Sequence, residues 1–259
     1  MEGVGANLLR VDGVSVRFGG IVALDAVSFG IDAGQIAGLI GPNGAGKTTL
    51  FNCLSRLYEV DRGRIEFDRL SLLDKPRHQI AALGIGRTFQ NLALFRTMTV
   101  FENVMLGRHC RTHSGFLSNA IRLPQVGREE HESAAQAAQL VSFLGLDEVA
   151  GARVGDLPFG TQKRVELGRA LASKPKLLLL DEPASGLNHE EVDALAALIR
   201  DIRDRLQVTV LLVEHHMTLV MNVSDKVIAL DFGRKIAEGT PAEVGKHPDV
   251  ITAYLGTAH

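Results

Sequence analysis

The segment GPNGAGKTT at residues 41–49 combines three glycines with a lysine and two threonines. It fits the pattern G-x-x-x-x-G-K-[ST], in which Gly41 and Gly46 frame a loop that ends in Lys47 and Thr48. Glycines let backbone N–H groups turn towards phosphate oxygens, the lysine reaches the β- and γ-phosphates, and the threonine hydroxyl binds Mg²⁺. The pattern therefore predicts a nucleoside triphosphate site with Mg²⁺. The residues expected to bind the nucleotide here are Gly41, Pro42, Asn43, Gly44, Ala45, Gly46, Lys47, Thr48 and Thr49.

A second motif, LLLLDEP at residues 177–183, ends a strongly apolar run with two acids. Asp181 is expected at a strand end, where it can hold Mg²⁺ through water. Glu182 is placed to polarise an attacking water, because hydrolysis needs a base beside the γ-phosphate. The alternative is a pair of strand-terminal acids that cap the next helix. A kinase would need an acceptor pocket, and the guanine-reading N-K-x-D motif of a GTPase does not occur in the sequence.

Short apolar segments must position the phosphate loop. Residues 8–40 predict strands, because LLRVDGVSVRF and LDAVSFGI place apolar residues near period two. QIAGLI (35–40) leads directly into the loop, and a helix is expected from Lys47 to about Leu57. RGRIEF (62–67) predicts a further strand. A strand before the loop and a helix after it are the context that this motif requires.

Strands and helices alternate again after residue 158. KLLLLDEP and VTVLLVEHH predict buried strands, and KVIALDFGRKIAEG predicts a terminal hairpin. Asn188 and Glu191 resemble the first residues of a capped helix. Its apolar stripe is Val192, Leu195, Ile199 and Ile202. The expected fold class is α/β, with a P-loop NTPase core on a mostly parallel sheet, N-terminal antiparallel strands and an inserted helical subdomain.

The sequence between the two motifs changes character. TVFENVMLGRHC and GREEHESAAQAAQLVSFLGL predict helices, with a loop or partner-contact segment at 114–128 between them. The apolar stripe of the second helix is Ala134, Ala137, Ala138, Val141 and Leu144. We therefore expect the first part of the nucleotide-binding core at 1–90 and a helical insertion at 91–158. The second part of the core is expected at 159–240, and a tail at 241–259.

Composition excludes several classes of protein. The chain has 259 residues, is 46% apolar and carries a net charge of −2, which argues against a dedicated nucleic-acid binder. No run of about 18 apolar residues predicts a membrane span, and the N-terminus does not resemble a signal peptide, so a cytosolic protein is expected. Cys53 and Cys110 are expected to be reduced thiols. His109 and His113 would flank Cys110 on a helix, but no further ligand pattern predicts a metal centre.

Together these motifs resemble an ABC-type ATPase, from about residue 8 to the C-terminus. The resemblance implies that Phe18 stacks on adenine, although an ordinary core aromatic is the alternative at this position. It also implies that Gln90 senses Mg²⁺ and the γ-phosphate, and that His215 contacts the γ-phosphate. The resemblance further implies ATP and Mg²⁺ as cofactors, with the metal near Thr48, Gln90 and Asp181. The implied signature residues are Pro158, Phe159, Gly160, Thr161 and Gln162, and those of the D-loop are Ser185, Gly186, Leu187 and Asn188.

A finer resemblance points to one subgroup, the ATPases of bacterial importers for branched-chain and other hydrophobic amino acids. It is carried by GIGRTFQNLALFRTMTVFENVMLGRH, by EPASGLN and by the tail GRKIAEGTPAEVGKHPDVITAYLG. It implies two permease subunits, a second and non-identical ATPase, a periplasmic binding protein and a place on the cytoplasmic face of the inner membrane. A homodimer is the alternative to the heterodimer. Phe95 and Met98 are candidates for the permease contact, with the core of the helical insertion as the alternative.

Other functions within the ABC family stay open at this point. Related importers carry urea or other small amides. Soluble relatives that act on ribosomes or DNA usually have two cassettes or a long coiled coil, and exporters often fuse the cassette to membrane helices. The chain shows one cassette and neither feature.

Two residues depart from the family pattern. The signature usually reads L-S-G-G-Q, and Pro158 replaces its serine, so it offers neither a hydroxyl nor a backbone N–H. Asn188 replaces the D-loop aspartate. In the family, the signature of one subunit covers the ATP held by the other. Our hypothesis is therefore an asymmetric dimer in which the site covered by this chain's signature turns over more slowly. The alternative is a subgroup variation with little kinetic effect.

Overall fold

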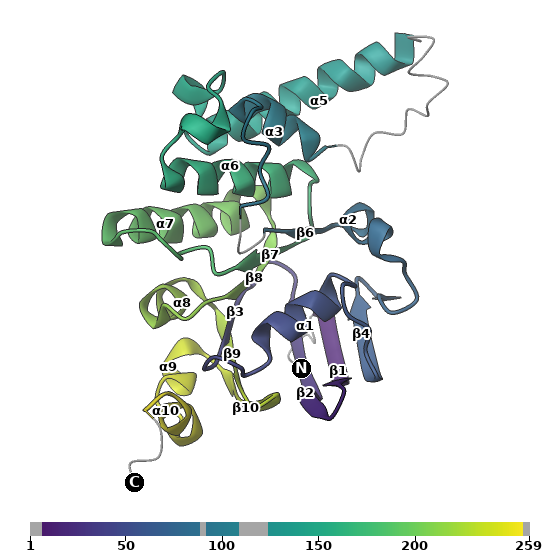
Figure 1. Cartoon of the computed structure of the whole chain (residues 1–259), viewed down its shortest axis with the longest axis vertical. Coiled ribbons are helices and arrows are strands. Elements are labelled where there is room, and N and C mark those ends of the chain that lie inside the picture. Colours follow the sequence, from purple (N-terminus) through teal and green to yellow (C-terminus); the bar gives the residue numbers. More distant parts are fainter. Residues whose placement is uncertain (1–6, 89–91, 109–123, 256–259) are drawn as a thin grey trace, which may run out of the picture. The chain divides into compact units, whose positions relative to one another are not determined.

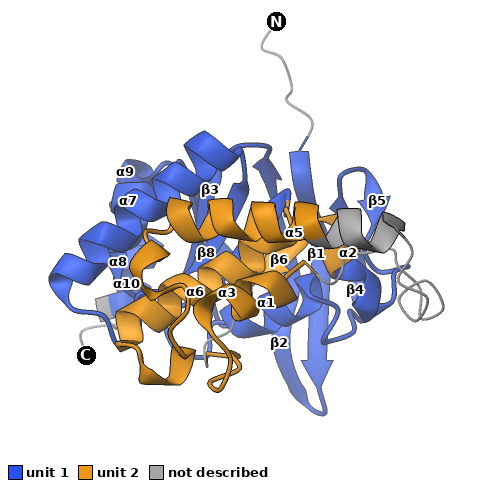
Figure 2. Cartoon of the chain, turned by 90° about the horizontal axis from the view of Figure 1, so that it is seen from above, with its two compact units in different colours: residues 1–80, 176–259 blue, residues 81–175 orange. Residues whose placement is uncertain are grey.

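The computed structural model describes residues 7–88, 92–108 and 124–255 of the chain. The chain divides into two compact units (Figure 2). The first contains residues 1–80 and 176–259, and the second is the intervening stretch Ala81–Pro175. Each unit has its own arrangement of elements.

An antiparallel sheet opens the first unit. Buried apolar residues alternate with more exposed residues along much of its two long strands, so one face of the sheet packs on the core. The predicted N-terminal antiparallel strands are confirmed. In spatial order the strands are β2 (Ile21–Asp32), β1 (Asn7–Phe18), β4 (Arg62–Phe67) and β5 (Leu70–Ser71).

A mostly parallel sheet forms the centre of the first unit. The three strands β3, β8 and β7 are buried along their whole length, as strands covered on both faces are. The predicted terminal hairpin is present, since β9 and β10 pair in antiparallel fashion. In spatial order the strands of this unit are β10 (Arg234–Gly239), β9 (Lys226–Asp231), β3 (Ile36–Ile40), β8 (Thr209–Val213) and β7 (Leu177–Asp181).

Helices cover both faces of this sheet. Figure 1 shows α1 (Lys47–Leu54) on one side, with α7 (His189–Leu206) and α8 (Met217–Val223) on the other. The helix after the loop ends three residues earlier than expected, because the chain turns through a left-handed residue at Arg56, with a φ of 55°. The remaining short elements of the unit are η1 (Arg77–Gln79), α9 (Pro241–Val244) and α10 (Pro248–Leu255), and α2 (Ile80–Leu83) spans the boundary between the units.

Helix α7 begins as the sequence predicts. The Asn188 side chain accepts a hydrogen bond from the Glu191 N–H, and the Glu191 carboxylate accepts one from the Asn188 N–H, which completes a capping box. Of the predicted stripe, Leu195, Ile199 and Ile202 are buried and Val192 is half-buried.

The second unit is built mainly from helices. Its elements are β6 (Ile85–Arg87), α3 (Val100–Leu106), α5 (Pro124–Phe143), the short helices η3 (Asp147–Val149) and η4 (Val154–Asp156), and α6 (Phe159–Ala172). The stretch 124–128, expected to be loop, is the start of α5. In the predicted stripe of α5, Ala138 is exposed and Ala134 half-buried, and Ser133 is buried instead.

Helix α6 belongs to this second unit, which therefore extends beyond the predicted insertion at 91–158. Helix α3 contacts both α5 and α6. At Gly107 the contact with α6 is so close that a Cβ would collide with the carbonyl oxygen of Arg169. This close packing could not be inferred from the composition of either segment. None of the helices in the described residues is both long and apolar enough to cross a membrane.

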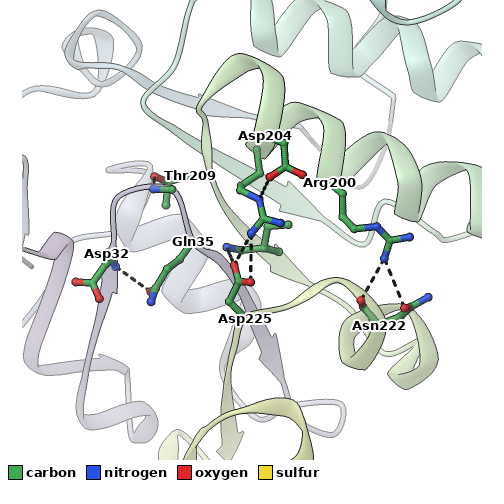
Figure 3. A network of polar contacts seen from close by, with 10 residues as sticks. Asp32, Gln35, Arg200, Asp204, Thr209, Asn222 and Asp225 are labelled. Carbon is green, nitrogen blue, oxygen red and sulfur yellow. Dashed lines mark hydrogen bonds and ion pairs between the residues drawn. The ribbon is translucent and has the colours of Figure 1, made fainter.

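Polar contacts fasten α7 to the amino-terminal ends of the central strands (Figure 3). Asp225, just before β9, accepts hydrogen bonds from Arg203 of α7 at 3.0 Å and from the N–H of Ile36, the first residue of β3, at 2.8 Å. Arg203 also forms an ion pair with Asp204. In the same region the Thr209 hydroxyl accepts a hydrogen bond from the Gly34 N–H.

Replacing Asp225 tests whether these polar contacts stabilise the fold. We expect Asp225→Asn to lower the free energy of unfolding by about 1 kcal/mol, because the Arg203 bond loses its charge and the Ile36 bond is weakened. The melting temperature should fall by about 2–4 °C in a chain of this size. The control is Asp201→Asn, which removes an exposed ion pair with Arg205 and should leave the melting temperature unchanged. Equal effects of the two variants would contradict the role of Asp225.

Candidate nucleotide site

The phosphate loop needs glycine where other segments approach it closely. Gly41, Gly44 and Gly46 all have positive φ angles, at 152°, 84° and 99°. A Cβ at Gly46 would lie 2.7 Å from the Ala23 carbonyl oxygen, and one at Gly41 would collide with that of Leu230. Neighbouring strands therefore impose the loop conformation, and only glycine fits it.

Helix α1 presents its amino-terminal end to this loop. Its N-cap is Gly46, which supplies no capping side chain, so the first N–H groups of the helix remain available for an anion. The Thr48 side chain is exposed at this end and Thr49 is half-buried. The structure thus places the predicted loop residues 41–49 around the positive end of a helix.

Lys47 lies inside the loop. Its side chain is buried, with 7% of the residue exposed, and Nζ donates hydrogen bonds to the carbonyl oxygens of Gly41 at 2.6 Å and Pro42 at 3.0 Å. Burial lowers the pKa of Lys47 below its ordinary value, and the negative charge of Glu182 partly opposes this shift. The ammonium group is therefore held at the loop by its own carbonyls, near the acid that the sequence singled out.

The two acids of the second motif lie at the end of β7. Asp181 is the last residue of the strand and is buried. Glu182 has a φ of 46°, and its N–H donates to the Val213 carbonyl oxygen of β8 at 2.9 Å. A left-handed conformation is rare for a residue with a side chain, and such residues gather at functional sites.

His215 lies next to Glu182. It follows β8, and its side chain is 51% exposed. Its Nδ1 atom is 4.0 Å from Glu182 Oε2 and 3.9 Å from Glu214 Oε2. The structure therefore brings together Lys47, Glu182 and His215, three of the four residues expected to act on the γ-phosphate. The fourth, Gln90, lies outside the described residues, as do His109, Cys110 and His113.

Glu214 was missed in the sequence analysis. It is fully buried, yet its carboxylate accepts three hydrogen bonds from backbone N–H groups, those of Ala184 at 2.6 Å, His215 at 3.1 Å and His216 at 3.3 Å. The available signal was an acid directly after the apolar run VLLV (210–213), as Asp181 directly follows the apolar run LLLL (177–180).

Phe18 is not a core residue. It is 46% exposed at the end of β1, and its ring packs edge-to-face on Tyr58, with the ring centroids 5.1 Å apart. The alternative of an ordinary core aromatic is therefore wrong. Tyr58 is also exposed, so the pair forms an accessible aromatic surface that a base can stack on.

The segment Ser185–Asn188 joins the two acids after β7 to α7. The Ser185 N–H donates to the Glu182 carbonyl oxygen at 3.2 Å, and Gly186 has a φ of 81°. Asn188 caps its own helix through its side-chain oxygen, a role that the aspartate usual at this position can also fill.

The signature segment lies in the second unit, at the start of α6. Pro158 is the N-cap of this helix and supplies no capping side chain. Its carbonyl oxygen accepts a hydrogen bond from the Gln162 N–H at 3.0 Å. Phe159 is exposed, with the Lys163 ammonium 5.4 Å from the centre of its ring. The helix end behind Pro158 keeps the N–H groups that can face an anion.

A contact from the C-terminal helix to the loop was not anticipated. The Tyr254 hydroxyl of α10 accepts a hydrogen bond from the Gly41 N–H at 2.7 Å. Burial raises the pKa of this tyrosine. Among the described residues, no group of three or more His, Cys, Asp or Glu side chains could hold a metal ion by itself.

Comparisons with known proteins identify the family of the chain. Residues 24–185 match the model of the family described as "ABC transporter", and residues 234–259 match "Branched-chain amino acid ATP-binding cassette transporter". The chain is 43% identical to the high-affinity branched-chain amino acid transport ATP-binding protein BraF of Pseudomonas aeruginosa, over 97% of this chain and 98% of that one. It is 42% identical to LivG of Escherichia coli over the same shares.

Solved structures with a similar fold belong to the same family. The ADP conformation of MJ1267, an ATP-binding cassette of an ABC transporter, superposes with a TM-score of 0.84 and 31% identity, over 97% of this chain and 99% of that one. A nucleotide-free cassette from an ABC transporter gives 0.83 and 30%. The chain therefore belongs to the ABC transporter family, as an ATP-binding cassette that hydrolyses ATP.

Proposed function

We propose that this chain powers an importer for branched-chain or other hydrophobic amino acids. The observation that carries the proposal is the 43% identity to BraF, which extends over 97% of the chain. The match of residues 234–259 to the branched-chain amino acid model supports the same subgroup at the C-terminus. ATP binding and hydrolysis by two cassettes would drive alternating access in separate permease subunits.

Each residue of the site has its own role in ATP binding or hydrolysis. Lys47 exchanges its two loop carbonyls for β- and γ-phosphate oxygens, and His215 contacts the γ-phosphate from the end of β8. Glu182 polarises the attacking water. Its partial exposure leaves the carboxylate accessible, and its charge already acts on Lys47. Phe18, with Tyr58, stacks on the adenine.

Mg²⁺ fits the oxygen donors at this site. The Thr48 hydroxyl is exposed at the start of α1 and the Asp181 carboxylate ends β7, and Mg²⁺ prefers a few such ligands together with phosphate oxygens and water. Thr48 and Asp181, with Gln90, are the residues that would hold it. When bound, the ion neutralises charge between the β- and γ-phosphates.

Removing the proposed base tests the assignment. We expect Glu182→Gln to lower the rate of ATP hydrolysis by about 10²–10⁴-fold, because the amide cannot accept the proton of the attacking water. ATP binding should persist, since Lys47 and the loop are intact, and the ATP-bound dimer should accumulate on gel filtration. Glu132→Gln, on an exposed part of α5, is the control and should hydrolyse ATP normally. Normal hydrolysis by Glu182→Gln would show that the base lies elsewhere.

The signature segment supports a dimer with two unequal sites. In such a dimer this chain's signature covers the ATP of its partner, and Pro158 cannot donate a hydrogen bond to that γ-phosphate. This chain's own residues at Lys47, Asp181, Glu182 and His215 are those of a competent site. We therefore favour a heterodimer with a second, homologous ATPase, in which the site covered by Pro158 turns over more slowly.

Restoring a hydroxyl tests this asymmetry. We expect Pro158→Ser to raise ATP turnover of the reconstituted complex by about twofold to threefold, because one additional hydrogen bond strengthens the slower site. The serine should also cap α6 and stabilise the chain by about 1 kcal/mol. Pro158→Ala is the matched control, since it restores the backbone N–H without the hydroxyl. Unchanged turnover in Pro158→Ser would count against unequal sites.

An exposed aromatic side chain in the second unit suits the permease contact. Phe95 is 55% exposed, so the alternative of a core residue is wrong for Phe95, whereas Met98 is half-buried. The buried Asn103 amide donates to the carbonyl oxygens of Phe95 and Thr99 and accepts from the Phe95 N–H. These bonds hold the segment so that Phe95 faces outward, where a permease helix can pack on it.

Capture from the native membrane tests the proposed partners. We expect this chain to co-purify with two permeases and a second, different ATPase, on the cytoplasmic face of the inner membrane, with the periplasmic binding protein attached through the permeases. The variant Phe95→Asp should lose the permeases while its ATP binding is unchanged. Ribosomal or DNA-bound partners would contradict the transport function, and permeases encoded beside a urea- or amide-binding protein would contradict the amino-acid substrate.

A further inference from the structure

Glu214 is a carboxylate that connects the two loops of the site. Its side chain is fully buried between the ends of β7 and β8. Oε1 accepts a hydrogen bond from the Ala184 N–H, which belongs to the loop after β7. Oε2 accepts hydrogen bonds from the N–H groups of His215 and His216, which begin the loop after β8. One side chain therefore fixes the backbone of both loops.

On the side of β7, this bond restrains the loop that carries Glu182. The Glu182 N–H is bonded to the carbonyl oxygen of Val213, and two residues later Ala184 is bonded to Glu214. These two attachments bracket the left-handed φ of Glu182, a conformation that persists only where the surroundings impose it. Without the Ala184 bond, the loop can relax and carry the carboxylate of Glu182 away from its position.

On the side of β8, the same carboxylate restrains the loop that carries His215. It holds the N–H of His215 itself and that of His216, the N-cap of α8. The His215 ring is half exposed, with Nδ1 3.9 Å from Glu214 and 4.0 Å from Glu182. The position of this ring relative to Glu182 thus depends on backbone that Glu214 holds.

The site requires a carboxylate at this position. Three N–H donors point at the side chain from two sides, and only a carboxylate offers an acceptor oxygen to each side. A glutamine would turn its NH₂ group towards N–H donors on one side.

We propose that Glu214 is a positioning residue that keeps Glu182 and His215 in the arrangement needed for ATP hydrolysis. The inference rests on the proposed roles of Glu182 and His215 at the γ-phosphate. Glu214 does not itself reach the nucleotide, because it is fully buried. It acts on the catalytic step through the geometry of two loops, where a displacement of about 1 Å can lower a rate by about 10²-fold.

The test compares variants of the full chain in the reconstituted transporter. We expect Glu214→Gln to lower kcat for ATP hydrolysis by about tenfold or more, with the KM for ATP and the affinity for ATP changed by less than about threefold. A fall in kcat with little change in KM and in ATP affinity distinguishes a positioning role from a role in ATP binding, because the substitution does not alter the phosphate loop or Lys47. Melting temperatures measured on the same samples give the loss of stability.

The matched control is Asp225→Asn. Asp225 also accepts a backbone N–H, that of Ile36, but at the amino-terminal end of β3, away from the phosphate loop. It should lose stability while keeping the kcat of the folded protein. Should Glu214→Gln fail to fold, Glu214→Asp decides the matter. It keeps the charge and remains near the His215 N–H, but it is one methylene too short to reach Ala184 as well, so kcat should still fall.

Two results would overturn the proposal. One is a folded Glu214→Gln or Glu214→Asp variant with the kcat of Asp225→Asn. The other is a loss of activity that falls entirely on ATP affinity. Measuring Glu182→Gln in the same assay distinguishes a failure of the positioning role of Glu214 from a failure of the base assignment of Glu182. If Glu182→Gln is inactive while the Glu214 variants are active, only the positioning role fails. If Glu182→Gln is itself active, the assignment of the base fails, and the positioning role of Glu214 fails with it.

Discussion

The register of three parallel strands is the constraint on which the site depends. Leu39 of β3 and Asp181 of β7 both pair with Val213 of β8, so the three strands end in one row. Directly beyond this row the chain supplies the phosphate loop, Glu182 and His215 from three distant parts of the sequence. Ligand sites of parallel sheets form at this carboxyl edge. Since all three strands are buried throughout, hydrophobic packing sets the distances between these charged side chains. A slip of one residue would reverse the direction of each side chain.

The ionisable groups at this edge differ in how deeply they are buried, and the role of each group follows from its burial. Glu214 is fully buried and satisfied by N–H groups, so its contribution is fixed geometry. Glu182 and His215 are partly exposed and 4.0 Å apart, which leaves them able to reach a substrate and to adjust when it binds. Lys47 is intermediate, because it is buried but bonded only to carbonyl oxygens of its own loop among the contacts that involve Nζ in the described residues. If phosphate oxygens replace these carbonyls as partners of Lys47 Nζ, the ammonium group pairs with a negative charge, and the backbone needs to move little.

Much of this arrangement was predictable from local sequence. The strand before Gly41, the acids after β7, the capping box of α7 and the terminal hairpin each depend on short-range patterns that a few residues determine. What the sequence analysis missed depends on contacts between distant segments. Helix α6 joins the second unit through close packing at Gly107, and Tyr254 reaches Gly41 across more than two hundred residues. No periodicity records such contacts, and the role of Glu214 emerges only once β7 and β8 lie side by side.

The two departures from the family pattern preserve local structure and change only what the chain offers to a partner. Pro158 occupies the N-cap of α6 with a φ of −56°, which its ring favours, and its carbonyl still accepts the first hydrogen bond of the helix. Asn188 caps α7 with a capping box, as aspartate would. Both residues are therefore compatible with the local fold of the helices that they begin. What is lost is one hydroxyl at the start of α6 and one negative charge at the start of α7, both on exposed or half-exposed surface. In the proposed dimer, changes of this kind bear on the partner's nucleotide rather than on this chain's own.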